Sequence, residues 1–408
     1  MIKNLTPFVA QGEIEINSSK SFAHRYVILA CLSSGKTILK NVGNSVDILA
    51  TIGCMQRLGA KIEYDGLNAI VYGIENFNKE IEVDFLESGS TMRFLIPIFS
   101  VLGVKTKFTG RGKLLERPND ALYSALNKKG VKIENNQING KLQGGKFNID
   151  ATISSQYISG LLMAFTLINE DCTVNLVGNL VSKNYLDITL SALKDFGVDC
   201  IVNENSITIN KNSKLKSKGF YQIEGDWSSA CFPIVLGLLG KKVIVNGLNP
   251  NSLQGDKKVV EILQNAGANL QFEEGKLIAQ NSQIKGLRVD IKDIPDSAPI
   301  LAVLMATLKG KSTMLNVDRL KIKESDRLLA IIENLKKAGI KTEYSNNQLT
   351  VFGGKIKGAN FLGYNDHRIV MAFSVLASIA NGNSTITDME AVSKSYKNFF
   401  EDLTKLGG

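Results

Sequence analysis

Two hydrophobic patterns alternate along the chain, and each predicts a different kind of helix. In the first, an acidic or amide residue is followed by apolar residues at helical spacing, then by a glycine and a stretch with strand character. We expect each such segment to be an amphipathic helix that opens on a side-chain N-cap, closes on a C′ glycine and leads into a strand. The segments are 47–64, 119–135, 186–202, 256–272, 325–344 and 398–408.

The closing glycines of these segments are evenly spaced. They lie 71, 67, 70, 72 and 68 residues apart, at Gly59, Gly130, Gly197, Gly267, Gly339 and Gly407. Such regular self-similarity is typical of a repeated structural unit. The sequence therefore predicts six copies of one unit.

The second pattern occupies the stretches between these helices. Each segment begins with Ser, Asp, Asn, Gln or a basic residue and is then apolar on nearly every face, which is typical of a buried helix. The six segments are 19–37, 88–106, 154–168, 226–242, 295–313 and 365–385. Because their interiors are apolar, we expect their polar N-termini to emerge at a cleft or an interface.

Together the patterns predict a mixed α/β fold in which each unit contains strand, helix, strand, helix and strands. Three units per lobe would give two lobes with central buried helices. If the lobes face each other, several helix N-termini point into one cleft. Helix N-termini carry free N–H groups and a positive partial charge, so this arrangement favours anion binding.

Composition narrows the function. The chain has 408 residues, 44% of them hydrophobic, and a formal net charge of +9 spread along its length. It is long enough to bury large cores, so disorder is excluded for most of it. Lysine far outnumbers arginine, and arginines retained in so lysine-rich a chain suit bidentate binding of carboxylate or phosphate. They are Arg25, Arg57, Arg93, Arg111, Arg117, Arg288, Arg319, Arg327 and Arg368.

Several classes of site and location are disfavoured. Five cysteines without C-x-x-C spacing and two histidines argue against a disulfide framework and a zinc site, and Cys31 and Cys231 fall in apolar runs that predict burial. The amino terminus lacks a signal-peptide core and no apolar run approaches a bilayer span, so we expect an intracellular soluble protein. The GKT at 35–37 lacks the first glycine of a P-loop, because Ala30 stands there, and no nucleotide cofactor is indicated.

Four polar clusters break the repeat. The first places Lys20, Ser21 and Arg25 at the head of a buried helix. The second joins Gly89 and Arg93 to Arg117. The third is the run 154–157, and the fourth combines 321–327 with 365–368. Helix capping or a solvated charged face would explain any one of them, but all of them fall at the same phase of the repeat.

Asp296 is a single carboxylate at the start of a nearly all-apolar helix. An N-cap, worth about 1 kcal/mol, is the simpler interpretation. The functional interpretation is a partly desolvated base beside cations.

These clusters, taken in order, closely resemble the 5-enolpyruvylshikimate-3-phosphate synthase (3-phosphoshikimate 1-carboxyvinyltransferase) branch of the enolpyruvyl transferase family. The likeness covers essentially the whole chain. Its motifs are SSQ (154–156), SK-x-Y-x-D-I-T (182–189), IPD (294–296), KESDR (323–327) and YNDHR (364–368).

The resemblance implies an inside-out α/β barrel of two lobes with three βαβαββ repeats each. The first lobe would be 19–223, and the second 1–18 with 224–408. It also implies transfer of the enolpyruvyl group of phosphoenolpyruvate to the 5-hydroxyl of shikimate 3-phosphate, in the shikimate pathway to chorismate and the aromatic amino acids. A tetrahedral intermediate would lose phosphate. We expect a cytoplasmic monomer that acts on small molecules without metal, cofactor, nucleic acid or membrane.

The resemblance also implies site residues. The catalytic groups would be Asp296 as base, with Glu324 and Lys20 handling the proton at the methylene carbon. Shikimate 3-phosphate would be bound by Lys20, Ser21, Arg25, Ser154, Ser155, Gln156, Ser182, Tyr185, Asp296 and Lys323. Phosphoenolpyruvate would be bound by Lys20, Gly89, Arg117, Gln156, Arg327, Arg368 and Lys394.

The sequence departs from the family pattern at four positions. Glu87 stands where many members have Asn, and Ser90 where Thr is common. Arg319 occupies a position where some members touch substrate with Asn, so we do not transfer that contact. Lys397 replaces a usual proline near Lys394.

Two other functions share parts of this pattern. The sister enzyme that transfers enolpyruvyl to UDP-N-acetylglucosamine relies on a loop cysteine near the Arg117 region, and no cysteine lies between Cys54 and Cys172. A ring-shaped DNA clamp would also have six similar units, but it predicts diffuse Lys and Arg on amphipathic helices. Here the polar groups stand at the starts of buried helices.

Overall fold

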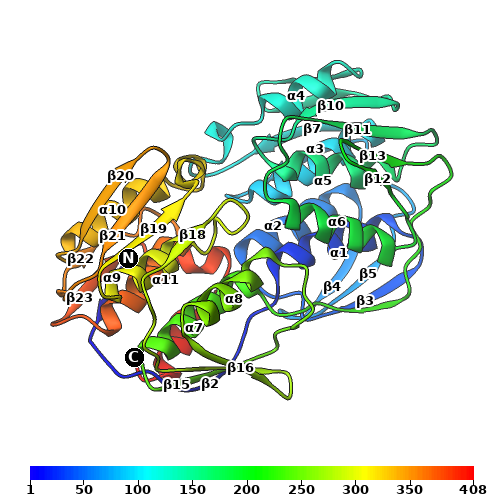
Figure 1. Cartoon of the computed structure of the whole chain (residues 1–408). Helices are drawn as coiled ribbons and strands as arrows, with labels where there is room; N and C mark the ends of the chain where they lie inside the picture. The colour runs from blue at the N-terminus through cyan, green and yellow to red at the C-terminus, as the bar shows by residue number, and fades with distance from the viewer. The chain divides into compact units, whose positions relative to one another are not determined.

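The chain folds into two compact units, each with its own hydrophobic core. A computed structural model describes all residues, Met1–Gly408. One unit is Ser18–Glu224, here called the 18–224 unit. The other joins Met1–Asn17 to Gly225–Gly408 and is called the 225–408 unit. Figure 1 shows the helices and sheets of both, and the mixed α/β class predicted from the sequence is confirmed.

The 18–224 unit contains three four-stranded sheets, with orders β14-β3-β5-β4, β6-β7-β9-β8 and β10-β11-β13-β12. In each, the first two strands are parallel and the others pair antiparallel. The strands are β3 (Lys36–Lys40), β4 (Lys61–Tyr64), β5 (Ala69–Tyr72), β6 (Glu80–Asp84), β7 (Lys105–Thr109), β8 (Val131–Glu134), β9 (Gln137–Gly140), β10 (Lys146–Asp150), β11 (Cys172–Val177), β12 (Ile201–Asn203), β13 (Ser206–Ile209) and β14 (Phe220–Gln222).

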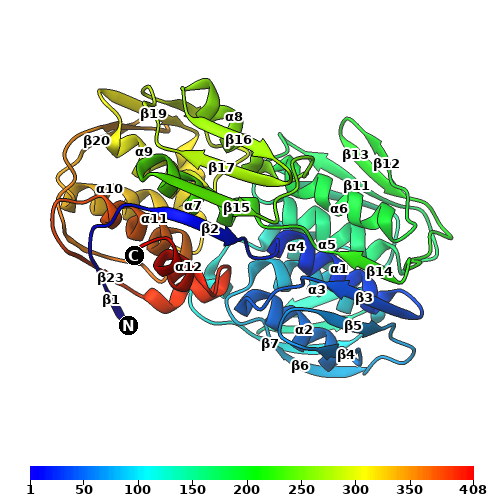
Figure 2. The ribbon, with the colours of Figure 1, turned by 90° about the horizontal axis from the view of Figure 1, so that it is seen from below.

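The 225–408 unit repeats this topology. Its four-stranded sheets have orders β16-β17-β15-β2 and β18-β19-β21-β20, and a three-stranded sheet has the order β1-β23-β22. The blue strand β2 lies beside β15 in Figure 2 and pairs with it in parallel. The strands are β1 (Ile2–Leu5), β2 (Gln11–Glu15), β15 (Lys242–Asn246), β16 (Asn269–Glu273), β17 (Lys276–Gln280), β18 (Arg288–Asp290), β19 (Lys311–Leu315), β20 (Lys341–Ser345), β21 (Gln348–Phe352), β22 (Asn360–Phe361) and β23 (Ser384–Thr387).

All six apolar segments form helices whose residues are almost entirely buried, as predicted. In the 18–224 unit they are α1 (Lys20–Leu32), α3 (Gly89–Leu102) and α5 (Ser155–Phe165). In the 225–408 unit they are α7 (Trp227–Leu239), α9 (Ala298–Thr307) and α11 (His367–Ser378). Cys31 and Cys231 are both buried within them, which confirms their interpretation as core residues.

The six amphipathic segments also form helices. They are α2 (Val46–Leu58), α4 (Asp120–Asn127), α6 (Lys183–Asp195), α8 (Lys258–Asn265), α10 (Arg327–Lys337) and α12 (Phe399–Lys405). All six predicted closing glycines have positive φ, between 80° and 123°. Residues that carry a side chain rarely adopt this backbone conformation. The need for it at each helix end accounts for the regular glycine spacing. Four short 3₁₀ helices complete the fold: η1 (Leu114–Glu116), η2 (Gly255–Lys257), η3 (Val317–Ile322) and η4 (Met389–Lys394).

The prediction that acidic or amide side chains cap the amphipathic helices holds only in part. Asp326 caps α10, accepting from the Leu329 amide at 2.9 Å. Asp47 lies inside α2, which Ser45 caps, and Asp256 lies before the N-cap of α8. Asn119 makes no cap bond at all. The prediction was wrong at these three because their side chains bind residues from other elements, described below.

No helix has both the length and the apolar composition to cross a bilayer.

Candidate active site

In the 18–224 unit, polar side chains gather at the starts of the three buried helices. Lys20 begins α1, and its Nζ donates to Asp47 Oδ2 at 2.7 Å. Ser154 is the N-cap of α5 and accepts from the Gln156 amide at 3.3 Å, so here capping is at least part of the explanation. Ser155 is buried behind it, and Ser182, in the left-handed region with φ 53°, precedes α6.

Arg25 is a buried cation held by neutral groups. Its Nη1 donates to the Ser21 carbonyl at 2.7 Å, its Nε to Thr189 Oγ1 at 2.7 Å and its Nη2 to the Tyr185 carbonyl at 2.9 Å. The guanidinium also lies 4.8 Å from the centre of the Phe94 ring. Burial lowers the pKa of Arg25 to about 9, because no carboxylate compensates its charge. A bound anion would supply that compensation.

Arg93 organises the second part of this unit's polar groups. Its Nη1 donates to Gln156 Oε1 at 2.7 Å and its Nε to Asn119 Oδ1 at 3.0 Å, while Gln156 Nε2 donates to Ser90 Oγ at 2.9 Å. The amide of Gln156 is thus fixed by α3 on both sides.

Gly89 allows Arg117 to approach the start of α3. A Cβ added at Gly89 would lie 2.7 Å from Arg117 Nη1, closer than a Cβ atom comes to a non-bonded heavy atom. The glycine therefore leaves the space that this guanidinium occupies. Together these contacts place Gly89, Arg117 and Gln156 in one polar group at the start of α3.

A buried hydroxyl chain connects α1 to the start of α3. His24 Nδ1 lies 2.7 Å from Thr51 Oγ1, which lies 2.7 Å from Thr91 Oγ1, and Thr91 Oγ1 donates to Ser88 Oγ at 2.7 Å. Burial lowers the pKa of His24 well below its usual value, and the charges of Lys20 and Arg25 add to the effect. His24 is therefore neutral in the folded protein.

This burial makes stability depend on pH. Below about pH 6.5 the unfolded chain protonates His24 and the folded chain does not, so the free energy of unfolding falls by up to about 1.4 kcal/mol per pH unit from this group. His24→Gln should flatten the pH dependence by that amount when urea unfolding is followed by circular dichroism. Thr51→Val, which loses the same hydrogen bond but keeps the imidazole, should retain it. Parallel curves for His24→Gln and the unchanged protein would contradict this assignment.

The 225–408 unit contains a carboxylate cluster centred on Arg327, the first residue of α10. Arg327 is fully buried and binds three carboxylates: its Nε donates to Asp366 at 2.8 Å, its Nη1 to Asp296 at 2.8 Å and its Nη2 to Glu324 at 2.6 Å. Burial opposes its charge, but these carboxylates prevail and raise the pKa of Arg327. The arginine is thus held at the crossing of three segments.

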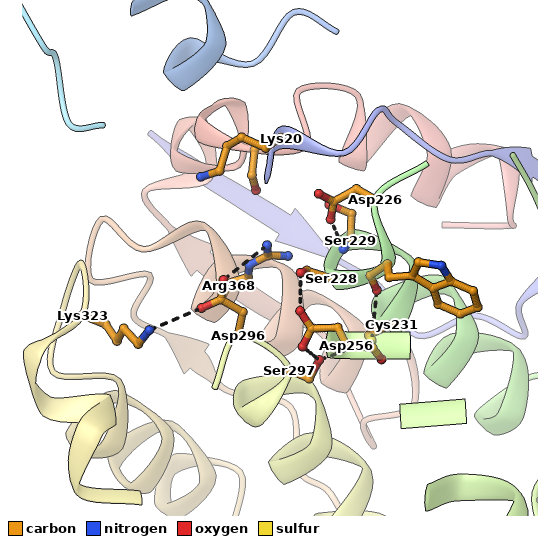
Figure 3. A network of polar contacts seen from close by, with 12 residues as sticks. Lys20, Asp226, Ser228, Ser229, Cys231, Asp256, Asp296, Ser297, Lys323 and Arg368 are labelled. Atoms are coloured by element: carbon orange, nitrogen blue, oxygen red, sulfur yellow. Dashed lines mark hydrogen bonds and ion pairs between the residues drawn. The ribbon is translucent and has the colours of Figure 1, made fainter. Parts of the chain in front are cut away.

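Asp296 lies among three cations. Besides Arg327, Lys323 Nζ and Arg368 Nη2 each lie 3.9 Å from its carboxylate, as Figure 3 shows. Burial raises its pKa, but the three cations outweigh burial and lower the pKa of Asp296. Ser297, not Asp296, occupies the N-cap position of α9, so the capping interpretation of Asp296 was wrong. The base-beside-cations interpretation agrees with this geometry.

Arg368 has donors to spare. It is 3% exposed, and its buried Nε and Nη1 have no hydrogen-bond partner. Buried donors are rarely left unpaired, and a planar guanidinium matches the oxygens of carboxylate or phosphate. Lys394 lies close to the same helix start, since its Nζ donates to the Asn365 carbonyl at 2.6 Å. Burial lowers the pKa of Lys323 to about 8.

The predicted site residues divide between the two units. Lys20, Ser21, Arg25, Gly89, Arg117, Ser154, Ser155, Gln156, Ser182 and Tyr185 belong to the 18–224 unit, and Asp296, Lys323, Glu324, Arg327, Arg368 and Lys394 to the 225–408 unit. No group of three or more His, Cys, Asp or Glu side chains is arranged to hold a metal ion.

Sequence reasoning missed the residues that hold these side chains in place. They are Asp47, which pairs with Lys20, Thr189, which binds Arg25, and Asp366, which binds Arg327. Thr189 lies inside the motif at 182–189 and Asp366 inside the one at 364–368, but a motif does not show which contacts its residues make. Asp47 carried no signal beyond its place in a helix.

Comparison with known proteins gives a consistent result. A family model described as EPSP synthase (3-phosphoshikimate 1-carboxyvinyltransferase) matches residues 7–403. The chain is 37% identical to the 3-phosphoshikimate 1-carboxyvinyltransferase of Clostridium beijerinckii and 38% identical to that of Clostridium botulinum, each time covering 98% of this chain and 96% of the relative. A solved EPSP synthase from Acinetobacter baumannii is similar in fold, with TM-score 0.82 and 23% identity over 100% of this chain and 98% of that one.

Proposed function

This chain belongs to the EPSP synthase (3-phosphoshikimate 1-carboxyvinyltransferase) family, and we propose that it transfers the enolpyruvyl group of phosphoenolpyruvate to the 5-hydroxyl of shikimate 3-phosphate and releases phosphate. The structural observation that carries the proposal is Arg368 beside Asp296. The two buried, unpaired donors of Arg368 suit an anionic substrate. The Asp296 carboxylate beside them suits a second substrate that must lose a proton.

Both substrates are polyanions, and the proposal divides the cations between them. Shikimate 3-phosphate is bound by Lys20, Ser21, Arg25, Ser154, Ser155, Gln156, Ser182, Tyr185, Asp296 and Lys323. Phosphoenolpyruvate is bound by Lys20, Gly89, Arg117, Gln156, Arg327, Arg368 and Lys394. Arg25, a buried cation without a carboxylate partner, supports the first assignment, and the donors of Arg368 support the second.

The reaction then proceeds by addition and elimination. Asp296 takes the proton of the 5-hydroxyl, and the 5-oxygen of shikimate 3-phosphate bonds to the central carbon of phosphoenolpyruvate. Glu324 or Lys20 gives a proton to the methylene carbon. In the second step the new methyl group returns one proton, the carbon–oxygen bond to phosphate breaks, and phosphate leaves. Fixed cations around the reacting groups stabilise the charge that moves during these steps.

The cations also tune the base. Without substrates, Lys323, Arg327 and Arg368 lower the pKa of Asp296 and weaken it as a base. Bound carboxylate and phosphate groups offset those cations, so the basicity of Asp296 rises when both substrates are present. Asp296 therefore abstracts the proton readily only when both substrates are bound.

The proposal includes the finer architecture and setting. The lobes are 19–223 and 1–18 with 224–408, each an inside-out α/β arrangement of three repeats, which the recurring sheet topology supports. The protein acts as a cytoplasmic monomer on small molecules and needs no cofactor.

Phosphate release tests the function. The protein is incubated with phosphoenolpyruvate and either shikimate 3-phosphate, unphosphorylated shikimate or UDP-N-acetylglucosamine. Release should be fast only with shikimate 3-phosphate. If the folded protein released nothing above background with it and used UDP-N-acetylglucosamine instead, the proposal would be wrong.

Arg117→Ala tests the phosphoenolpyruvate assignment. Loss of a charged hydrogen-bonding partner should raise KM for phosphoenolpyruvate roughly 10- to 100-fold, with a smaller change in KM for shikimate 3-phosphate. Arg111→Ala is the matched control, because Arg111 is 68% exposed and pairs with Asp84 at the surface. Unchanged affinity for phosphoenolpyruvate in Arg117→Ala would remove Arg117 from the site.

A further inference from the structure

A buried carboxylate, Asp256, lies next to the proposed base and has no role in the reaction described above. It belongs to η2 and is 3% exposed. Its Oδ1 accepts from Ser297 Oγ at 2.5 Å, and its Oδ2 accepts from Ser228 Oγ (Figure 3). No Lys or Arg makes an ion pair with it. A buried carboxylate held only by two hydroxyl groups is costly, which calls for an explanation.

Asp256 is joined to Asp296 through the chain. Ser297 follows Asp296 directly and occupies the N-cap position of α9, yet its hydroxyl does not cap that helix. The hydroxyl donates to Asp256 instead, so Asp256 holds the turn that carries Asp296. From its other side, Arg327 holds the Asp296 carboxylate at 2.8 Å.

Ser228 provides the other anchor. It lies in the first turn of α7, whose N-cap Asp226 accepts from the Ser229 amide at 2.6 Å. Asp256 therefore joins the start of α7 to the start of α9, and its two hydrogen bonds fix how these helix starts align. A side chain of different length or charge at position 256 would let the Asp296 turn shift.

The charged and titratable groups around Asp256 come from several elements. Asp296 lies before α9, Arg368 in α11, and Asp226 and Cys231 in or before α7, with Cys231 Sγ 3.4 Å from Ser297 Oγ. Lys258, two residues after Asp256 in the sequence, has its Nζ 3.8 Å from the carboxylate of Asp293. Burial and the charge of Asp296 raise the pKa of Asp256 to about 6, against the effects of the two serines and Arg368.

We propose that Asp256 is a positioning residue for the reaction: through Ser297 it sets the orientation of Asp296, and its negative charge makes the Asp296 carboxylate a stronger base. The inference rests on the function proposed above. When Asp256 is protonated its charge is absent and Asp296, beside three cations, holds a proton less strongly. Turnover therefore rises as Asp256 loses its proton.

Asp256→Asn and Ser297→Ala separate the two contributions. Asp256→Asn should lower kcat roughly 10- to 100-fold, as expected for a misplaced base, with both KM values nearly unchanged. It should also abolish the rise of kcat near pH 6 that we expect for the unchanged protein, because the charge of Asp256 appears there. Ser297→Ala should lower kcat as well but keep that rise, because the charge of Asp256 remains.

Asp402→Asn is the matched control. Asp402 is a buried carboxylate of the same unit. It accepts from the Tyr396 hydroxyl at 2.8 Å and from Lys405 Nζ at 2.7 Å. Its replacement should lower the melting temperature without removing the rise of kcat with pH. A purely structural role for Asp256 predicts the same behaviour for Asp256→Asn.

The outcomes are distinguishable. If the unchanged protein shows no turnover, the proposed function fails. If it turns over and Asp256→Asn keeps its kcat and pH profile, this inference alone is wrong. If Asp256→Asn does not fold, Ser297→Ala decides: a lowered kcat at unchanged KM supports the role, and an unchanged kcat overturns it.

Discussion

Arg327→Met is expected to destabilise the 225–408 unit by about 3–5 kcal/mol, because it leaves a buried carboxylate without its cation. Asp366 is fully buried and receives the Nε donor of Arg327 at 2.8 Å. Trp227, the only tryptophan of the chain, is buried in the same unit, so its fluorescence during urea unfolding reports the change. Turnover should fall to background even where the variant remains folded, because Arg327 also holds the Asp296 carboxylate at 2.8 Å and is assigned to phosphoenolpyruvate.

Two further variants make this result specific. Arg288→Met, at an exposed position on β18, should change stability by no more than about 0.5 kcal/mol. Adding Asp366→Asn to Arg327→Met removes the uncompensated charge, so the double variant should be more stable than the single one. If Arg327→Met unfolds like Arg288→Met, the carboxylate cluster does not stabilise this unit.

Asp296→Asn is expected to lower kcat about 100- to 10,000-fold, the usual contribution of a general base. The amide keeps the size of the side chain and can still accept from Arg327, so shikimate 3-phosphate should bind with similar affinity. Binding is measured by calorimetric titration and turnover by phosphate release, which separates loss of the base from loss of the site.

Asp293→Asn is the matched control on the same turn. Asp293 is partly exposed and its carboxylate lies 3.8 Å from Lys258 rather than beside Arg327. Its replacement should leave kcat within a few-fold of the unchanged protein. Near-normal turnover in Asp296→Asn would exclude Asp296 as the base.

The helices could be predicted because their signals are local. Apolar residues on nearly every face mark α1 and α9 in the sequence, and both helices are buried. A glycine with positive φ ends α2, and this signal does not depend on distant residues. Repetition of these signals then indicated the number of units. The register and pairing of the strands could not be obtained this way, because they depend on contacts between distant segments.

The candidate site was predicted mainly from motifs, and its supporting contacts were not. Asp256 had the pattern of a helix cap, but its oxygens bind Ser228 and Ser297, residues 28 and 41 positions away. Asp47 likewise binds Lys20 across two helices rather than capping α2. A side chain with several available partners takes the one that the fold brings near, and sequence alone does not show which one that is.

The most direct test of the account is the identity of the product. Isotopically labelled phosphoenolpyruvate is incubated with the protein and shikimate 3-phosphate, and the mixture is followed by NMR. We expect the label in an enol ether on the 5-oxygen of shikimate 3-phosphate, with one phosphate released per product. Labelled pyruvate with free phosphate, or label on UDP-N-acetylglucosamine in a competition with both acceptors, would contradict the account.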